Sequence, residues 1–211
     1  MKKIFETAQL LIIAIIIPLI GRYDIVLTWP ILTVILYGVF LSVSQPTMVF
    51  KKEAKSHDRH SMHAILLGGL LTFVIPICDY AYGKTKIVRL DQVVTIVGLA
   101  MIFGGFAFRY WAIRVLGRFF TSKVHIQEDH ELVQDKPYQW LRHPSYTGAW
   151  VSALGISTFL QSRFGIVFCI FIYFPIYIYR IECEEKALKE TFPQSYPQYQ
   201  LKTSKMFPHL Y

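Results

Sequence analysis

Long apolar segments constrain the fold of this chain more than any other feature of its sequence. Four of them cover residues 4–20, 25–43, 62–82 and 92–108. Each is close to the roughly 20 residues that an α-helix needs to cross ~30 Å of hydrocarbon. Because 54% of the 211 residues are hydrophobic, the chain is too apolar for an ordinary soluble domain of this size. We therefore expect an all-α integral membrane protein with about four transmembrane helices in residues 1–108.

Two shorter apolar runs follow, at residues 149–160 and 164–179. Each is short for an upright span, so they predict a helical hairpin that only just crosses or inserts partly, giving up to six spans in all. The polar tail, residues 181–211, is expected to begin as a helix over residues 182–191. No boundary divides the chain, and we expect residues 1–211 to form one membrane domain.

The basic residues predict the orientation. Placing the N-terminus, residues 44–61, residues 109–146 and the tail together with Arg180 on one side leaves five of the 22 Lys and Arg residues opposite: Arg22, Lys84, Lys86, Arg89 and Arg163. This bias indicates a protein with both termini in the cytosol. The basic start followed by an apolar run is similar to a signal peptide, but no small-residue cleavage site follows Ile20, which favours an uncleaved first helix.

Several patterns point away from other functions. The net charge of +8 is not accompanied by a nucleic-acid recognition motif, so we expect no nucleic-acid partner. The three cysteines form no metal-binding or disulfide framework. His57, His60 and His63 lie in a charged segment, where contact with solvent or lipid headgroups is favoured over a metal site. Asp79 lies close to the end of its apolar segment, where reaching the interface or pairing with Lys84 explains it as well as a proton-relay role would, so it is left out of the site.

A polar stretch over residues 127–148 is the main candidate for a site. Within it Arg142 and His143 precede Pro144, which disfavours helix before it and can start a helix itself. The first backbone N–H groups of that helix would point outward, so an anion could dock on them and on Arg142 or His143.

A second candidate lies where the last apolar run ends. Arg180 and Glu184 are four residues apart, so they share one face of a helix. One interpretation is a surface ion pair worth only ~0.3–0.5 kcal/mol. The other is a site in which Glu184 accepts hydrogen bonds from a cofactor while Arg180 holds a substrate anion. The position of Arg180, directly after a long uncharged run, favours the second.

The order of these motifs resembles the isoprenylcysteine carboxyl methyltransferase family, integral membrane enzymes that use S-adenosyl-L-methionine. The resemblance covers about residues 109–208, roughly half the chain, and it is carried by residues 109–117, 130–133, 137–138, 142–148 and 184–185 together with Phe192, Tyr196, Tyr199 and Pro208. It implies that residues 109–211 form a catalytic region, with a cytosolic cofactor pocket between the 109–148 region and the tail.

Residue roles follow from the same resemblance. The implied cofactor site comprises Gln127, His130, Glu131, Leu132, Val133, Tyr138, His143, Pro144, Ser145, Tyr146 and Glu184, to which the charge argument adds Arg142. Arg180 is expected to be the catalytic residue that binds the acceptor, and no metal is needed.

The implied reaction is methyl transfer from S-adenosyl-L-methionine to a carboxylate or hydroxyl of a lipophilic or prenylated acceptor in the membrane. Three alternatives stay open. The chain could methylate a phospholipid or a phenolic lipid, or it could be an NADPH-dependent sterol-type reductase. It could also be a small transporter or scaffold, although that function predicts ionisable residues at mid-membrane rather than at one surface.

Overall fold

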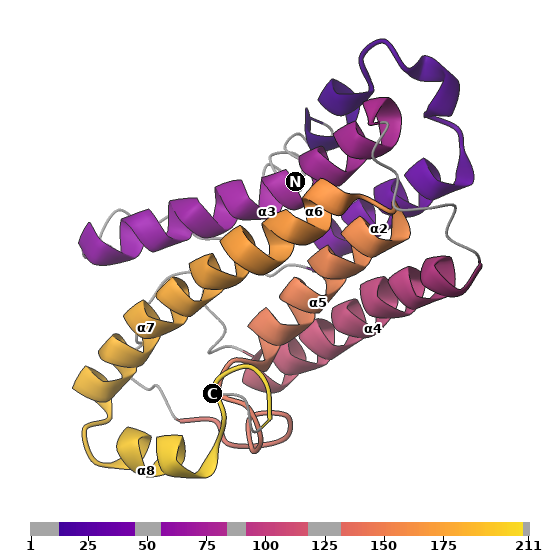
Figure 1. The fold of residues 1–211 in the computed structure, drawn as a ribbon. Helices are drawn as coiled ribbons and strands as arrows, with labels where there is room; N and C mark the ends of the chain where they lie inside the picture. Colours follow the sequence, from indigo (N-terminus) through magenta and orange to yellow (C-terminus); the bar gives the residue numbers. More distant parts are fainter. Residues whose placement is uncertain (1–12, 45–55, 84–91, 118–131, 209–211) are drawn as a thin grey trace.

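The computed structural model describes residues 13–44, 56–83, 92–117 and 132–208. Within these ranges the secondary structure is helical, apart from an isolated bridge between Leu141 and Ser204. The elements run in the order η1 (Ile17–Leu19), η2 (Tyr23–Ile25), α2 (Trp29–Ser44), α3 (Ser56–Tyr82), α4 (Gln92–Leu116), α5 (Pro144–Phe159), α6 (Arg163–Phe168), η4 (Cys169–Tyr173), α7 (Phe174–Thr191) and α8 (Ser195–Lys202) (Figure 1). The all-α prediction is confirmed.

Among the residues that the structure describes, three helical segments are long and apolar enough to cross a membrane. They cover His60–Tyr82, Gln92–Leu116 and Arg163–Thr191, and Trp29–Ser42 is a shorter apolar helix. The predicted segments at 62–82 and 92–108 are thus confirmed as helices, and the second continues to Leu116. Residues 4–12 of the first segment lie outside the described residues. The second segment becomes helical only from Trp29, after the short helix η2.

The prediction that both arms of the 149–179 hairpin are short is wrong for its second arm. Helix α6, the π turn η4 and α7 follow one another without a break, and together they form a 29-residue span from Arg163 to Thr191. The sequence concealed this length because the helix continues beyond its apolar run into charged residues. The first arm, α5, has 16 residues and is short, as expected.

The π turn η4 has a specific backbone arrangement. The N–H of Phe174 bonds to the carbonyl of Cys169, five residues earlier, so the turn accommodates one residue more than an α-helix would. The same carbonyl accepts a hydrogen bond from Nε1 of Trp150 on α5, at 2.9 Å. The irregular turn is therefore tied to the neighbouring helix.

Helices α4 and α5 pack at backbone distance through a seam of glycines. A Cβ atom added to Gly105 would lie 2.6 Å from the carbonyl oxygen of Gly148, and one added to Gly148 would lie 2.5 Å from the carbonyl oxygen of Gly105. Small residues of this kind allow membrane helices to approach closely without any hydrophobic drive between them. Ser152 adds a hydrogen bond from its Oγ to the carbonyl of Ile102, at 3.0 Å. The seam fixes the start of α5 against the last turns of α4.

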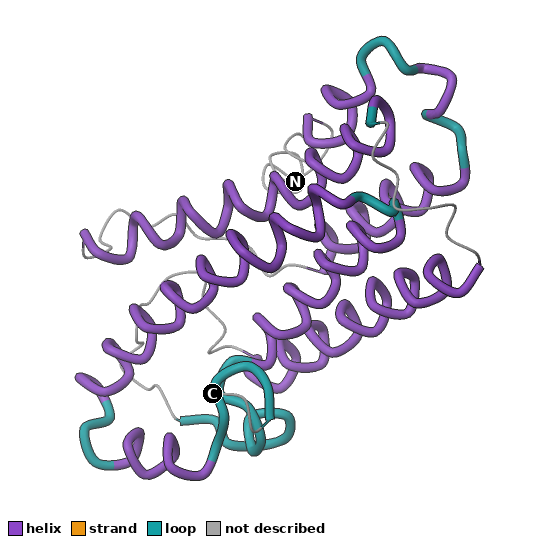
Figure 2. Tube along the Cα trace, in the orientation of Figure 1, coloured by secondary structure: helices purple, strands orange, loops and turns teal. Residues whose placement is uncertain are grey.

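The bundle has two distinct ends. At one of them the loop before α5 and the loop after α8 lie together (Figure 2). At that end Ser61 of α3 accepts a hydrogen bond from Arg180 of α7 at 2.9 Å, and Arg109 of α4 donates to the carbonyl of Ser145 on α5 at 3.0 Å. The first turns of α3 and α5 therefore meet the later turns of α4 and α7. Ser61 and Arg109, from two of the segments predicted to share one side of the membrane, thus lie at the same end of the fold, whereas the N-terminus lies outside the described residues.

Candidate active site

The first wall of the candidate site is the entry into α5. Pro144 is the first residue of that helix, and His143 before it is non-helical, with φ −126° and ψ 55°. The amide groups of Tyr146 and Thr147 bond to the carbonyl of His143. The helix start predicted from Pro144 is confirmed, because a proline favours the first helical position and restricts the residue before it.

The second wall is the charged end of α7. Nε of Arg180 lies 3.1 Å from Oε1 of Glu184, so the predicted pair on one helix face exists. It is not a solvated surface pair, since the side chain of Arg180 is 3% exposed and that of Glu184 19%. Tyr146 of α5 donates its hydroxyl proton to Oε1 of Glu184, and Nε of Arg180 lies 3.4 Å from the same hydroxyl. The two walls therefore join at Glu184.

His143 lies between two carboxylates. Its Nδ1 is 3.5 Å from Oε2 of Glu184, and its Nε2 is 3.4 Å from Oε1 of Glu185. Its ring stacks on that of Tyr146, with centroids 5.7 Å apart. Burial by itself lowers the pKa of His143, but the hydrogen bonds and charges of Glu184 and Glu185 outweigh burial and raise the pKa above its ordinary value. His143 thus contacts Glu184 through one ring nitrogen and Glu185 through the other.

Arg142 points toward the tail rather than toward the predicted anion site. Its Nε bonds to Oε1 of Glu185 at 2.7 Å, and its Nη1 donates to the backbone carbonyls of Gln200 and Thr203. Both partners of the Arg142–Glu185 pair are 8% exposed. Docking of an anion on Arg142 therefore has less support than docking near His143.

The other predicted residues lie around this junction. Tyr138 is buried, its hydroxyl donating to the carbonyl of Ala112 at 3.2 Å and its own carbonyl accepting from the hydroxyl of Tyr199 at 2.6 Å. Burial raises its pKa. Leu132 and Val133 are half-buried, and Ser145 is buried in the first turn of α5. The predicted residues outside the described ranges are Gln127, His130 and Glu131.

A cavity opens beside the junction, between the tail and the segment before α5. It has a volume of ≈ 880 Å³ and is lined by Trp111 of α4, by residues 134–136 and Gln139, and by Tyr199, Lys202 and Thr203 of the tail. These are parts of the two regions expected to form the pocket. None of the predicted cofactor residues lines this cavity.

Three contributions to the site were missed by the sequence reasoning. Glu185 binds Arg142 and the tail, Ser61 binds Arg180, and Gln200 donates to Oε2 of Glu185 at 2.8 Å. Glu185 carried a usable signal, since it is the second carboxylate of an acidic pair beside Glu184. Ser61 carried none, because its role depends on α3 lying against α7. In the described part of the chain, no group of three or more His, Cys, Asp or Glu is arranged to hold a metal ion.

Comparison with known proteins first defines the class. A solved structure of a eukaryotic intramembrane Ras methyltransferase, an isoprenylcysteine carboxyl methyltransferase determined without a monobody, has the same arrangement with a TM-score of 0.61. The match covers 97% of this chain and 74% of that chain, at 22% sequence identity. The fold is therefore that of an integral membrane protein of this class.

The sequence comparisons then find similarity to one family. The model of the isoprenylcysteine carboxyl methyltransferase family matches residues 96–190. A protein-S-isoprenylcysteine O-methyltransferase of Saccharomyces cerevisiae is 32% identical over 118 residues, which are 55% of this chain and 49% of that protein. Protein-S-isoprenylcysteine O-methyltransferase B of Arabidopsis thaliana is 35% identical over 104 residues, or 48% and 53%. The chain spans about half the length of these relatives, and the resemblance predicted from its sequence is confirmed.

Proposed function

We propose that this chain is an S-adenosyl-L-methionine-dependent O-methyltransferase that acts on the carboxylate of a lipophilic acceptor held in the membrane. One observation carries the proposal: Arg180, Glu184, Tyr146 and His143 converge at the end of an apolar helical bundle. A charged cofactor and an acceptor with a lipid tail could meet there. The names of the relatives make a prenylated cysteine the first acceptor to test.

The residues at the junction fit the cofactor. Glu184 keeps 19% of its side chain exposed while its neighbours Arg180 and His143 are more deeply buried. Its carboxylate can accept hydrogen bonds from the hydroxyl or ammonium groups of the cofactor, and its charge favours a cation nearby. We further propose that the rest of the cofactor site is formed by Tyr138, Ser145, Leu132 and Val133, together with Gln127, His130 and Glu131.

When bound, S-adenosyl-L-methionine supplies an electrophilic methyl group on a sulfonium centre. An acceptor carboxylate is already a nucleophile, so the chain needs to supply alignment and exclusion of water rather than a general base. Arg180 is suited to orient that carboxylate, because a guanidinium binds oxyanions in a fixed geometry and this one is held by Ser61 and Glu184. Tyr146 fixes the Glu184 carboxylate from the opposite wall.

The orientation expected from the basic residues places this junction in the cytosol, with both termini on the same side. The clustering of the junction, the tail and the first turns of α3 at one end supports it. Labelling of single cysteines introduced at Arg163 and at Lys202 with a membrane-impermeant maleimide tests it. Modification of the Lys202→Cys protein in intact cells would contradict a cytosolic tail.

A binding titration tests the proposed cofactor. The detergent-purified protein is titrated in parallel with S-adenosylhomocysteine and with NADPH, and we expect saturable binding of the first alone. Transfer of a labelled methyl group to an N-acetylated S-prenylcysteine then tests the acceptor. The methyl ester of the same compound is the matched control, since it lacks the nucleophilic carboxylate. Binding of NADPH without S-adenosylhomocysteine would overturn the proposal in favour of a reductase.

A further inference from the structure

We infer that Glu185 is a positioning residue that locks the C-terminal segment 200–205 against the entry into α5 and so holds the Glu184 wall ready for the cofactor. The inference rests on the proposed function, because cofactor affinity is one of its readouts. Its structural readout, the closure of the tail, is independent of that function.

The two oxygens of Glu185 bind two segments that are far apart in the sequence. Oε1 accepts from Nε of Arg142 at 2.7 Å, and Oε2 accepts from Nε2 of Gln200 at 2.8 Å. Arg142 in turn donates through Nη1 to the carbonyls of Gln200 and Thr203. One buried carboxylate thus closes a ring of hydrogen bonds between α7, the tail and the segment before α5.

Backbone hydrogen bonds also join the tail to the segment before α5. The amide of Arg142 bonds to the carbonyl of Ser204 at 2.8 Å, the amide of His143 to the carbonyl of Lys205 at 3.0 Å, and the amide of Ser204 to the carbonyl of Trp140 at 3.1 Å. An isolated two-segment bridge of this kind is marginal alone, so side chains must hold its register. Glu185 and Arg142 are the charged pair in position to do so.

The neighbouring carboxylates divide the work. Adjacent helical residues point about 100° apart, so Glu184 faces Tyr146 and Arg180 while Glu185 faces Arg142 and the tail. His143 connects them, with one ring nitrogen 3.5 Å from Glu184 and the other 3.4 Å from Glu185. A displacement of Glu185 would therefore shift the imidazole of His143 and, through it, the carboxylate of Glu184.

The test compares Glu185→Gln with Glu182→Gln, a matched change at an exposed position of the same helix. We expect Glu185→Gln to weaken S-adenosylhomocysteine binding about 10-fold, as befits the loss of a charge-assisted hydrogen bond. Turnover at saturating cofactor should stay within about threefold. Hydrogen exchange of the amides of Arg142, His143 and Ser204, which donate in this bridge, should become faster, whereas Glu182→Gln should behave as the unchanged protein.

Gln200→Ala keeps the test decisive if Glu185→Gln fails to fold. It removes the tail contact to Oε2 without leaving a buried charge unpaired, and it should loosen the same amides and weaken binding about threefold. Unchanged exchange and affinity in both variants would overturn the inference, as would a large loss of turnover with unchanged affinity. Failure of the unchanged protein to bind S-adenosylhomocysteine would instead overturn the proposed function.

Discussion

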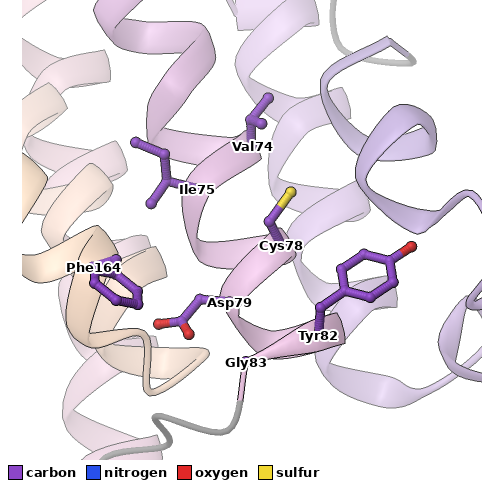
Figure 3. Close-up of a pocket in the computed structure, with 7 residues that line it drawn as sticks. All are labelled: Val74, Ile75, Cys78, Asp79, Tyr82, Gly83 and Phe164. Carbon is purple, nitrogen blue, oxygen red and sulfur yellow. The ribbon is translucent and has the colours of Figure 1, made fainter.

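The two ends of the helical bundle bury polar groups in different ways. At the end opposite the candidate site, Ser162 donates to Oδ2 of Asp79 at 2.8 Å and accepts from the amide of Gly165 at 2.9 Å, which caps α6. Asp79 lines an apolar cavity of ≈ 390 Å³ together with Phe164 and the last turn of α3 (Figure 3). Each polar group here completes a helix end.

At the site end, buried charge exceeds what the helix ends require. Arg142, His143, Arg180, Glu184 and Glu185 come from two segments and interact as one cluster. Burying ionised groups costs several kcal/mol each unless they are paired, so such a cluster is weak evidence for stability. The contrast separates an end whose polar groups complete helices from the end that carries the candidate site.

The largest expected effect is on turnover. Arg180→Ala removes the guanidinium proposed to orient the acceptor, and we expect kcat to fall about 100-fold, the usual cost of losing a positioned charge. S-adenosylhomocysteine affinity should fall much less. Arg163→Ala, an exposed arginine at the other end, is the control and should keep full activity. If kcat fell equally in the two variants, the two ends would not differ in their role in the reaction.

The glycine seam joins the two ends and can be broken separately. Gly148→Ala places a methyl group 2.5 Å from the carbonyl of Gly105, so we expect a loss of about 2 kcal/mol from overpacking. Gly104→Ala is the control on the same helix pair, since a Cβ there meets nothing within 4 Å. Denaturation in mixed micelles measures both. Equal stability of the two variants would show that the seam tolerates expansion.

The site end should also respond to pH. The pKa of His143 is raised above its unfolded value of about 6.5. Its stabilisation is therefore complete below about pH 6.5 and is lost as the pH rises through the raised pKa of the folded protein. We therefore expect thermal stability to fall as the pH rises above about 6.5, measured as melting temperature against pH. His143→Gln should flatten this profile, and a profile unchanged by the substitution would contradict the assignment.

The smallest effect is expected at the opposite end. Asp79→Asn keeps an oxygen acceptor for Ser162, so the cost in stability should be about 0.5–1 kcal/mol. Methyl transfer should stay within twofold of the unchanged protein. A loss of activity as large as that of Arg180→Ala would mean that both ends serve the reaction.

The sequence predicted what local rules determine. Apolar length predicted the helices, Pro144 predicted the start of α5, and the spacing of Arg180 and Glu184 predicted their contact. It could not predict that Arg142 faces Glu185 rather than an anion, because this depends on the tail returning to the entry of α5. It also missed the continuity of α6 and α7, because the apolar run ends near residue 179 while the helix continues to Thr191.

The π turn at Cys169–Tyr173 has a further consequence for the rotational phase of the last helix. An inserted residue turns everything after it by about 100° relative to a regular α-helix. Arg180 and Glu184 both follow the turn, so their direction depends on it. Deleting one residue there would shorten the helix by only ~1.5 Å, yet it would swing the acidic face away from Tyr146. The direction in which Arg180 and Glu184 point thus depends on a turn that ends at Tyr173, well before both of them in the same helix.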